Sequence, residues 1–586
     1  MIAPMKKFTF LIYHKQYQDF LTKLQELGVV HIIEQKKETN LEIKELNLKI
    51  NRFTKAIKFL KSFNPEKKEK PDITNGFQVL ENLEELQKQH ERLQQKLNLL
   101  KKEIKNLEPW GDFNPEVIKK LHEKNIYLKL FITSEKKFNP EWKEKYNIEI
   151  INQVGNTIYF TVICAKDEKL DIQAEEIKFP ERPLSELEQE KQHLEEEIEL
   201  INKQFQEYAE KYISLLEKNK NELIEKLDFN IAVLNTEKEA DEKVMVLQGW
   251  VPEEKKENLI KFLNDFAVVY LEEDPQKDDK VPILLKNNKF AKLFEPIAKM
   301  FSLPSYMELD LTPFFAPFFT LFFGFCIGDA GYGIILLLAT TYFKTKAKPN
   351  LKPVLTLAQI LGLSTIIIGT LVGTVFGYQL VNIESLKQYI LIPDQNQLFN
   401  ISLILGVIQI LFGMVIKVIN LTIQYGFKYS ISTIGWIIMV ISILGISLGF
   451  MKPIANITIW VGVGLILLFN DPGKNIFIQI GKGLWDLYNI TGFVGDVLSY
   501  VRLFALGISS AILGLVINQL GRQFLSIPII GPIIFIVFLT VGHAGNLMLA
   551  SLGAFVHPLR LTFVEFYKNA GFQGGGKEYK PFSLKK

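Results

Sequence analysis

The sequence predicts a two-part protein: N-terminal α+β lobes joined by long antiparallel coiled-coil arms, then an all-α polytopic membrane domain. Charge density marks the division. Residues 304–586 hold 28 charged side chains in 283 positions, about 10%, whereas residues 1–303 hold 105 in 303, about 35%. The C-terminal part also has several apolar runs of 18 or more residues, each long enough to cross about 30 Å of hydrocarbon. A wholly soluble enzyme and a single-pass receptor are therefore excluded.

The N-terminal region begins with short alternating patterns. Residues 7–13 and 29–33 predict strands, and residues 16–27 predict a helix that Gly28 ends. Further strand patterns lie at residues 126–132, 157–163 and 244–248. We interpret these patterns as two small α/β lobes within residues 1–303.

Long charged segments with apolar residues every three or four positions separate the lobes. They lie at residues 43–60, 83–107 and 194–215. Spacing of 3.5 residues predicts helices that bury one seam against a partner helix. Two prolines and a glycine within residues 64–76 predict that the first two helices fold back on each other. A solvated structural coiled coil is the simpler interpretation, and a strut that carries mechanical load is the alternative.

The apolar runs and the basic residues between them predict the topology of the membrane region, residues 304–586, which ends in a short cytoplasmic tail. Its seven apolar runs are 313–343, 354–380, 398–423, 431–450, 454–470, 484–520 and 529–567. The first contains a charge, Asp329, and is either one span or a hairpin. A hairpin gives eight helices and puts 13 basic residues on the cytoplasmic side, against Lys387, Lys452 and Arg522 outside. We therefore expect about eight helices and cytoplasmic termini, with the last two helices, of about 55 and 58 Å, strongly tilted.

Two arginines lie inside apolar runs, Arg502 and Arg560. An arginine at mid-membrane costs on the order of 3 kcal/mol, so each needs a counter-charge or a path to water. A guanidinium stays charged even between apolar walls, and can therefore act on a passing carboxylate. The simpler interpretation is that each arginine ends a helix and reaches the headgroups, which suits Arg560, nearer the C-terminus, better than Arg502.

Polar side chains share helix faces with these arginines at steps of three, four or seven residues. Such groups can line a proton or cation path, although local hydrogen bonding explains any single one equally well. Glu565, five residues after Arg560, either pairs with a basic group or lies in the interface. The candidates for the path are Asp329, Asp496, Ser499, Ser509, His543, Asn546, His557 and Glu565.

We expect neither a catalytic constellation nor a bound cofactor in this chain. Cys164 and Cys326 provide neither a disulfide framework nor a metal-binding spacing. The glycines and lysine of residues 571–577 resemble a phosphate loop, but Glu578 stands where serine or threonine is required. A flexible C-terminal tail is the better interpretation. The charge balance does not indicate nucleic acid, and no signal peptide is evident at the N-terminus.

Seven motifs resemble subunit I, also called subunit a, of bacterial and archaeal V/A-type ATPases, which is homologous to the eukaryotic vacuolar subunit a. The resemblance covers the whole length. The motifs are QGWVPEE (248–254), VPILLKNNKFAKLFEPI (281–297), PSYMELDLTPF (304–314), FFGFCIGDAGYG (322–333), GDVLSYVRLFALG (495–507), HPLRLTFVEF (557–566) and GGGKEYKPF (574–582).

This resemblance implies the stator membrane subunit of a rotary ATPase or ATP synthase, with two half-channels for H⁺ or Na⁺ beside a rotating proteolipid ring (c or K). Arg502 then faces the ring carboxylate, Arg560 assists it, and Asp329 matches a polar half-channel position. The cytoplasmic region then anchors peripheral stalks of subunits E and G, with the central-stalk cap subunit, C or d, as a further partner. The implied location is the plasma membrane of a bacterium or archaeon.

The chain departs from the eukaryotic pattern where that pattern has two glutamates and a histidine. The residues found there are Tyr488, Ala550 and Ser510. The half-channels must therefore use other groups, and we expect Asp496 on the cytoplasmic side and Asp329 with His557 on the outer side. Two alternatives stay open: a stand-alone secondary transporter whose arginines bind an anion, and a membrane scaffold without transport.

Overall fold

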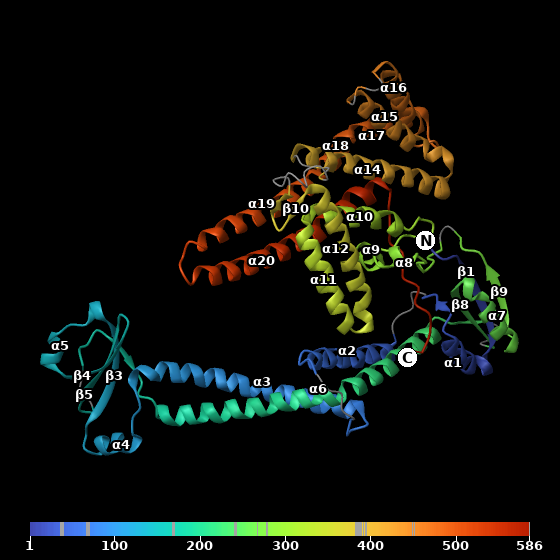
Figure 1. Cartoon of the computed structure of the whole chain (residues 1–586). Coiled ribbons are helices and arrows are strands. Elements are labelled where there is room, and N and C mark those ends of the chain that lie inside the picture. The colour runs from blue at the N-terminus through green and yellow to red at the C-terminus, as the bar shows by residue number, and fades with distance from the viewer. Residues whose placement is uncertain are drawn as a thin grey trace. The chain divides into compact units, whose positions relative to one another are not determined.

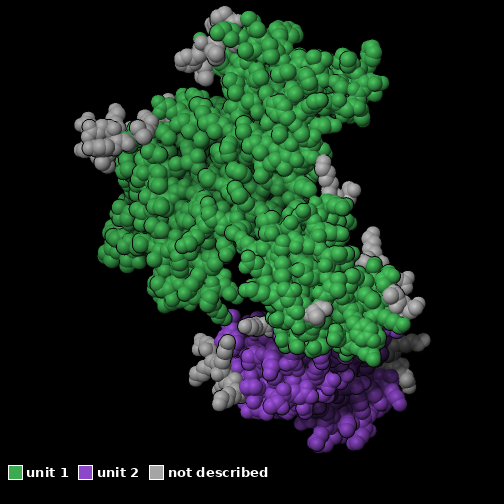
Figure 2. All heavy atoms as spheres, turned by 90° about the vertical axis from the view of Figure 1, so that its right-hand side faces the viewer, with its two compact units in different colours: residues 1–33, 236–582 green, residues 34–235, 583–586 purple. Residues whose placement is uncertain are grey.

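A computed structural model describes residues 1–34, 40–65, 71–166, 170–239, 243–266, 268–276, 279–380, 390, 392, 395–447, 449 and 452–584. Lys387, predicted in an outer loop, and Lys585 and Lys586, predicted in the tail, lie outside these residues. The chain forms two compact units, coloured separately in Figure 2. Unit 1 comprises Met1–Ile33 and Thr236–Phe582, and unit 2 comprises Glu34–Asn235 and Ser583–Lys586.

Unit 1 contains a five-stranded antiparallel sheet whose strands come from residues 5–32 and from residues 237–273. The strand order is β2–β8–β1–β9, and β7 pairs with β8. Phe8 lies opposite Gly249 on one side and Glu272 on the other. The predicted first strand, helix and second strand are confirmed. The elements are β1 (Met5–Tyr13), α1 (Tyr17–Leu27), β2 (His31–Ile32), β7 (Glu237–Glu239), β8 (Val244–Pro252), α7 (Lys256–Asp265) and β9 (Val269–Glu273).

Unit 2 is built around one helix of 51 residues, α6 (Leu184–Leu234). Helices α2 (Leu41–Lys61) and α3 (Gly76–Leu107) pack on it (Figure 1). The prediction that the first two helices fold back on each other is wrong about their main packing partner, which is α6 for both. Each fills its apolar seam chiefly with α6, whose buried Phe205 and Leu216 contact residues of both helices in one cluster.

Besides its long helices, unit 2 contains an antiparallel sheet of four strands in the order β4–β5–β3–β6. Its core contains the buried rings of Phe131 and Phe160, which stack with centroids 5.6 Å apart. The strands predicted at 126–132 and 157–163 are confirmed. The elements are α4 (Pro115–Glu123), β3 (Tyr127–Ser134), α5 (Glu141–Lys145), β4 (Asn147–Val154), β5 (Thr157–Cys164) and β6 (Glu175–Ile177).

The helical region of unit 1 begins with two short helices outside the apolar runs, α8 (Lys289–Lys292) and α9 (Glu295–Phe301). The apolar helices follow, joined in one place by the small hairpin of β10 and β11 (Figure 1). They are α10 (Thr312–Ile327), α11 (Ala330–Lys346), α12 (Lys352–Val372), β10 (Thr374–Val375), β11 (Tyr378–Gln379), α14 (Gln395–Tyr425), α15 (Ile431–Ser447), α16 (Lys452–Phe469), α17 (Ile476–Tyr488), α18 (Ile490–Leu498), α19 (Val501–Phe524), α20 (Gly531–Arg560) and α21 (Tyr567–Asn569).

Five stretches within the described residues are long and apolar enough to cross a membrane: Pro349–Val372, Asn396–Tyr425, Phe427–Ile446, Ile476–Phe524 and Gly531–Asn569. Helices α10 and α11 pass the same test together but are bent by 120°, so the run at 313–343 is not one straight helix. The run predicted at 484–520 begins earlier, at Ile476, and is interrupted by turns at residue 489 and at residues 499–500.

The C-terminal segment, residues 570–582, is not the flexible tail that its glycines predicted. The carboxylate of Glu308, which is 4% exposed, accepts backbone N–H groups of Gln573 (2.7 Å) and Gly574 (3.1 Å). The Gly576 N–H donates to Leu303 O, and the Tyr579 hydroxyl donates to Val29 O at 2.6 Å. The prediction failed because these partners are distant in sequence.

Candidate functional site

The two intramembrane arginines come together at one end of a helix pair. Helices α19 and α20 pack side by side, joined by residues 525–530 (Figure 1). Arg502 lies in the first turn of α19 and Arg560 ends α20, so the chain reversal puts both at the same end. Arg502 is half-buried, whereas the Arg560 side chain is 59% exposed.

An exposed apolar face runs along this helix pair from the arginines. On α20 the exposed residues recur at helical steps and include Val541, Met548, Leu552 and Val556. On α19 they include Ile512 and Val516. Ser509, a candidate from the sequence, lies among them and is exposed. Exposed apolar area of this extent marks a surface that lipid or a partner protein covers.

Glu565 is the carboxylate beside the arginines. Its Oε1 atom lies 4.0 Å from Arg560 Nε, and its side chain is only 2% exposed. Ser499 approaches the same carboxylate. Within the described residues, Glu565 Oε2 and Arg502 Nη1 are buried without a hydrogen-bond partner. The sequence left open whether Glu565 pairs with a basic group, and the structure pairs it with Arg560.

A π-helix over Leu561–Phe566 brings Arg560 and Glu565 together. In an α-helix, residues five apart lie about 140° apart around the axis, whereas a π-helix closes i to i+5. Pro558, inside α20, has no N–H to donate and crowds the preceding turn. At the end of α20 the Leu561 N–H is shared between His557 O and Pro558 O. The wider π-helical turn then follows, between Arg560 and Glu565.

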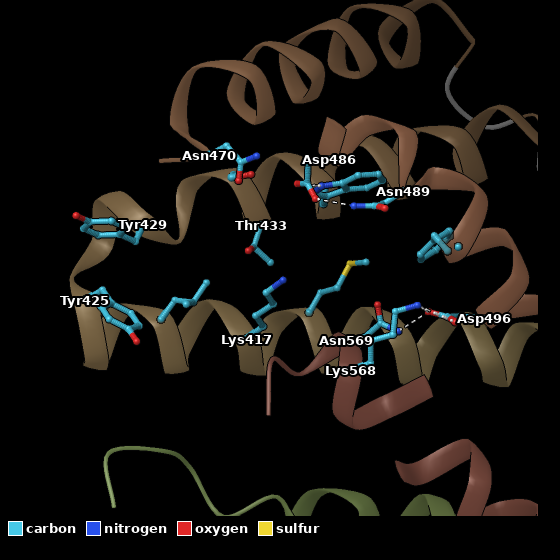
Figure 3. A pocket seen from close by; sticks show the side chains of 16 residues that line it. Lys417, Tyr425, Tyr429, Thr433, Asn470, Asp486, Asn489, Asp496, Lys568 and Asn569 are labelled. Atoms are coloured by element: carbon cyan, nitrogen blue, oxygen red, sulfur yellow. Dashed lines mark hydrogen bonds and ion pairs between the residues drawn. The ribbon is translucent and has the colours of Figure 1, made fainter. Parts of the chain in front are cut away.

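Asp496 lies on the wall of a cavity of about 560 Å³ (Figure 3). It accepts hydrogen bonds from Lys568 Nζ (3.0 Å) and Asn569 Nδ2 (3.0 Å). On another wall, Trp436 Nε1 donates to Asp486 at 2.9 Å. The other polar groups that Figure 3 shows around the cavity are Lys417, Tyr425, Tyr429, Thr433, Asn470 and Asn489. A cavity of this size with polar groups on its wall can hold water.

Asp329 is fully buried at the break between α10 and α11. Gly328, with φ of 60°, ends α10 in the left-handed conformation that glycine favours, and Asp329 caps α11. Its Oδ1 accepts the N–H groups of Tyr332 (3.1 Å) and Phe376 (2.9 Å), and Oδ2 accepts that of Gly377 (2.7 Å). The carboxylate thus fastens the hairpin of β10 and β11 to the helix break.

A polar network extends from this break to α19 and α20. The Tyr332 hydroxyl lies 2.7 Å from His543 Nδ1 and accepts a hydrogen bond from Asn546 Nδ2 at 2.8 Å. His543 Nε2 lies 3.1 Å from Asn518 Oδ1, and Asn518 Nδ2 donates to Phe376 O at 2.7 Å. The sequence candidates Asp329, His543 and Asn546 therefore belong to one network.

His557 lies elsewhere than beside Asp329. It interacts electrostatically with Arg502 and Arg560, one helical turn before the end of α20. The candidates therefore fall into three groups: the arginines with Ser499, His557 and Glu565; the cavity with Asp496; and the network with Asp329, His543 and Asn546. Ser509 belongs to none of these groups and lies on the exposed apolar face of α19 and α20.

Sequence reasoning missed several polar members of these groups. Asp486 and Asn489 precede Asp496 by helical steps, so the pattern that found Asp496 also contained them. Lys568 and Asn569 follow Glu565 at similar steps. Tyr332 and Asn518 had no local signal, because their partners lie on other helices.

Charged groups outside the apolar helices are paired as well. Asp471, between α16 and α17, accepts a hydrogen bond from Lys482 Nζ at 2.6 Å, and this ammonium lowers the pKa of Asp471. The Lys299 ammonium, 2.6 Å from Glu578, likewise lowers the pKa of Glu578. Burial raises the pKa of Glu295, although a hydrogen bond from Asn287 opposes this shift.

Comparison with known proteins shows which family the chain resembles. The model of the V-type ATPase 116 kDa subunit family matches residues 169–360. The V-type ATP synthase subunit I of Borreliella burgdorferi is 28% identical over 620 residues, which cover 100% of both chains. That of Chlamydia pneumoniae is 24% identical over 98% of this chain and 96% of its own.

An archaeal relative matches over a shorter stretch. The A-type ATP synthase subunit I of Methanocaldococcus jannaschii is 33% identical over 58% of this chain and 55% of its own length. A solved structure, of the cytoplasmic N-terminal domain of subunit I, a homologue of V-ATPase subunit a, aligns with 46% of this chain and 100% of that one. Its TM-score is 0.22 and its identity 16%. By its family model and these relatives, the chain is similar to the V-type ATPase 116 kDa subunit family and to subunit I of V-type and A-type ATP synthases.

Proposed function

We propose that this chain is the stationary membrane subunit of a rotary V/A-type ATPase, and that it forms two ion half-channels beside a rotating proteolipid ring, c or K. One observation carries the proposal: Arg502 and Arg560 meet at one end of the exposed apolar face of α19 and α20. An ion neutralises a ring carboxylate in one half-channel, and the neutral carboxyl then turns through lipid at low cost. At the other half-channel it releases its ion and meets Arg502.

The order of polar groups along the helix supports two separate half-channels. The cavity group Asp496 precedes Arg502 by six residues and lies in α18, across the turn at residues 499–500. The network group Asn518 follows Arg502 by sixteen residues, about 24 Å. A fixed cation between two polar regions repels a passing cation, so Arg502 blocks a direct leak while stabilising the empty ring carboxylate.

Basic residues support the sidedness of these regions. Lys417 and Lys568 line the cavity, and Lys474 and Lys482 lie in or beside the connection between α16 and α17. Because cytoplasmic connections carry an excess of lysine and arginine, we assign the cavity with Asp496 to the cytoplasmic side. The network with Asp329 and His543 then belongs to the outer side. A membrane potential contributes about 2.3 kcal/mol per charge per 100 mV to an ion that crosses between them.

The remaining architecture follows from the same proposal. Helices α10 and α11 each cross the membrane, which with α12, α14, α15, α16, the stretch α17–α19 and α20 makes eight crossings. The helices of unit 2 serve as coiled-coil arms that anchor peripheral stalks of subunits E and G, with the cap subunit, C or d, as a further contact. Both termini are cytoplasmic, the membrane is the plasma membrane of a bacterium or archaeon, and nucleotide is bound by other subunits.

Replacement of Arg502 in the assembled complex tests the proposal. Arg502→Ala removes the cation that faces the ring, so we expect ATP-driven ion transport in proteoliposomes to fall at least about tenfold while the complex still assembles. Arg522→Ala is the matched control, because Arg522 is exposed in the last turn of the same helix. We expect the control to transport normally.

Fully coupled transport by the Arg502→Ala complex would refute the arginine assignment. Anion uptake by the purified chain without a proteolipid ring would instead favour the stand-alone transporter. Unchanged coupling after replacement of both arginines would favour a scaffold.

A further inference from the structure

The hydrogen bonds around His543 have one set of directions in which every donor finds an acceptor. Asn546 Nδ2 donates to the backbone carbonyl of Ser510 at 3.0 Å, and this contact identifies the amide nitrogen. The same nitrogen therefore donates to the Tyr332 hydroxyl oxygen. Tyr332 is left with its own hydrogen to give, and His543 Nδ1, 2.7 Å away, receives it.

The same reasoning fixes the other side of the imidazole. Asn518 Nδ2 donates to the Phe376 carbonyl, so Asn518 presents its oxygen to His543. His543 Nε2 must therefore carry a hydrogen and donate it at 3.1 Å. The imidazole is neutral in this arrangement, and Nδ1 is its one unprotonated nitrogen.

The oxygen atoms of the network are already occupied by hydrogen-bond donors. Both oxygens of Asp329 accept backbone N–H groups, Asn518 Oδ1 accepts from His543, and the Tyr332 oxygen accepts from Asn546. A hard cation such as Na⁺ requires several oxygen ligands turned toward it. Binding Na⁺ here would break these contacts and leave buried N–H donors unpaired, which is costly.

We propose that the outer half-channel carries protons rather than Na⁺, and that His543 Nδ1 is the group that takes up and releases each proton. The inference rests on the proposed function, because it names the ion of that same half-channel. Histidine suits the task since it changes charge near neutral pH. His543 is half-buried, whereas its hydroxyl partner Tyr332 is fully buried.

The transfer balances without any co-reactant. For a proton that enters from outside, a hydronium ion gives its proton to the lone pair of Nδ1 and leaves as water, which makes an imidazolium, while the Tyr332 hydroxyl turns its hydrogen away. Nε2 keeps its hydrogen on Asn518 throughout. The imidazolium then returns the proton to a water molecule on the ring side, and Tyr332 donates to Nδ1 again. Asp329, from the start of α11, is the charged group that acts on His543; the other contacts come from neutral side chains of α11 and α19 and from the ring of Phe376.

Ion transport by the assembled complex in proteoliposomes tests this inference. ATP-driven acidification is followed with a pH-sensitive dye, and uptake of ²²Na⁺ is followed in parallel. We expect acidification in nominally sodium-free buffer, no stimulation by added Na⁺, and no ATP-dependent ²²Na⁺ uptake. His543→Gln keeps one acceptor and one donor but cannot be protonated, so we expect acidification to slow roughly tenfold or more.

Thr540→Ala is the matched control on α20, since the Thr540 hydroxyl is exposed and donates to Ile536 O of its own helix. ATP-dependent ²²Na⁺ uptake by the wild-type complex would overturn the inference even if His543→Gln failed to assemble. Normal acidification by an assembled His543→Gln complex would also overturn it. Neither result touches the proposed function, which Arg502→Ala tests separately.

Discussion

Buried charged side chains in this chain differ in how many hydrogen-bond partners they have. Asp329 is completely buried, and three backbone N–H groups occupy its two oxygens. Arg502 Nη1 and Glu565 Oε2 are also buried, yet neither has a hydrogen-bond partner within the described chain. Because an unsatisfied buried charge is costly, it persists where function requires it. We therefore assign Asp329 a structural role and propose that the arginine group acts on the ring carboxylate.

Asp329→Asn should loosen the break between α10 and α11. The new amide offers one acceptor oxygen and places an NH₂ group against a backbone donor, so at least one buried N–H loses its partner at a cost of about 2–3 kcal/mol. Cys326, three residues earlier and 1% exposed, reports on this locally. In a Cys164→Ser background that leaves a single thiol, we expect maleimide to label Cys326 several times faster in the variant.

Asp471→Asn is the control for that measurement. Asp471 is an acceptor in a connection outside the apolar helices, where it pairs with Lys474 and Lys482. Exposed pairs of this kind contribute little to stability. Equal labelling of Cys326 in both variants would show that the backbone contacts of Asp329 do not hold the break.

Among the elements, the π-helix after α20 has the clearest consequence for function. It places Arg560 4.0 Å from Glu565, whereas a regular helix would place them on different sides. Pro558→Ala restores the missing N–H and lets the helix continue regularly. We expect the ions transported per ATP hydrolysed to fall severalfold in the assembled complex, with assembly intact.

Pro532→Ala is the matched control for this element. Pro532 stands in the first turn of the same helix, where an N–H has no helical partner. Substitution there should leave coupling unchanged. If Pro558→Ala also leaves coupling unchanged, then the widened turn is not needed to bring the two charges together.

Local sequence patterns predicted many helices and strands but not which of them pack against each other. Alternation predicted β1, charges inside apolar runs marked the arginines, and helical steps found Asp496 and Asn546. The pairing of β1 with β8 and the contact of Tyr332 with His543, across 211 residues, depend on how distant segments pack. The π-helix also has no periodic signature. The sequence therefore predicted which helix faces are polar, but the division of the candidates into three groups required the fold.

At the scale of the whole molecule, unit 1 is closed by its C-terminal segment. This segment leaves α21 (Tyr567–Asn569), passes along Glu308 and Leu303, and ends on the N-terminal sheet. There the Phe582 N–H donates to Val30 O, and Tyr579 packs with Met5, Trp250 and Val281. The segment therefore ties the apolar helices to the sheet. In the stator that we propose, such a tie limits how far the two parts move apart under torque.

Substitutions of Tyr579 test this tie in graded steps. Burial raises the pKa of Tyr579, so its hydroxyl keeps its proton and donates to Val29 O at 2.6 Å. Tyr579→Phe removes only that hydrogen bond, at a cost of about 1 kcal/mol. Tyr579→Ala also removes a ring that is 7% exposed, at about 3–5 kcal/mol. We expect cleavage by a protease within residues 570–582 to accelerate in the order wild type, Phe, Ala.

Tyr488→Ala provides the matched control, because Tyr488 is 68% exposed and its loss should leave proteolysis of the C-terminal segment unchanged. The fluorescence of Trp250, which packs against Tyr579, gives a second local measurement. A shift of the Trp250 signal in Tyr579→Ala with accelerated cleavage locates the loosening at the sheet. Equally slow cleavage in Tyr579→Ala and Tyr488→Ala would mean that Glu308 and the backbone contacts hold the segment without the tyrosine. The segment would then be anchored by the glycine-rich stretch beside α9 rather than by the N-terminal sheet.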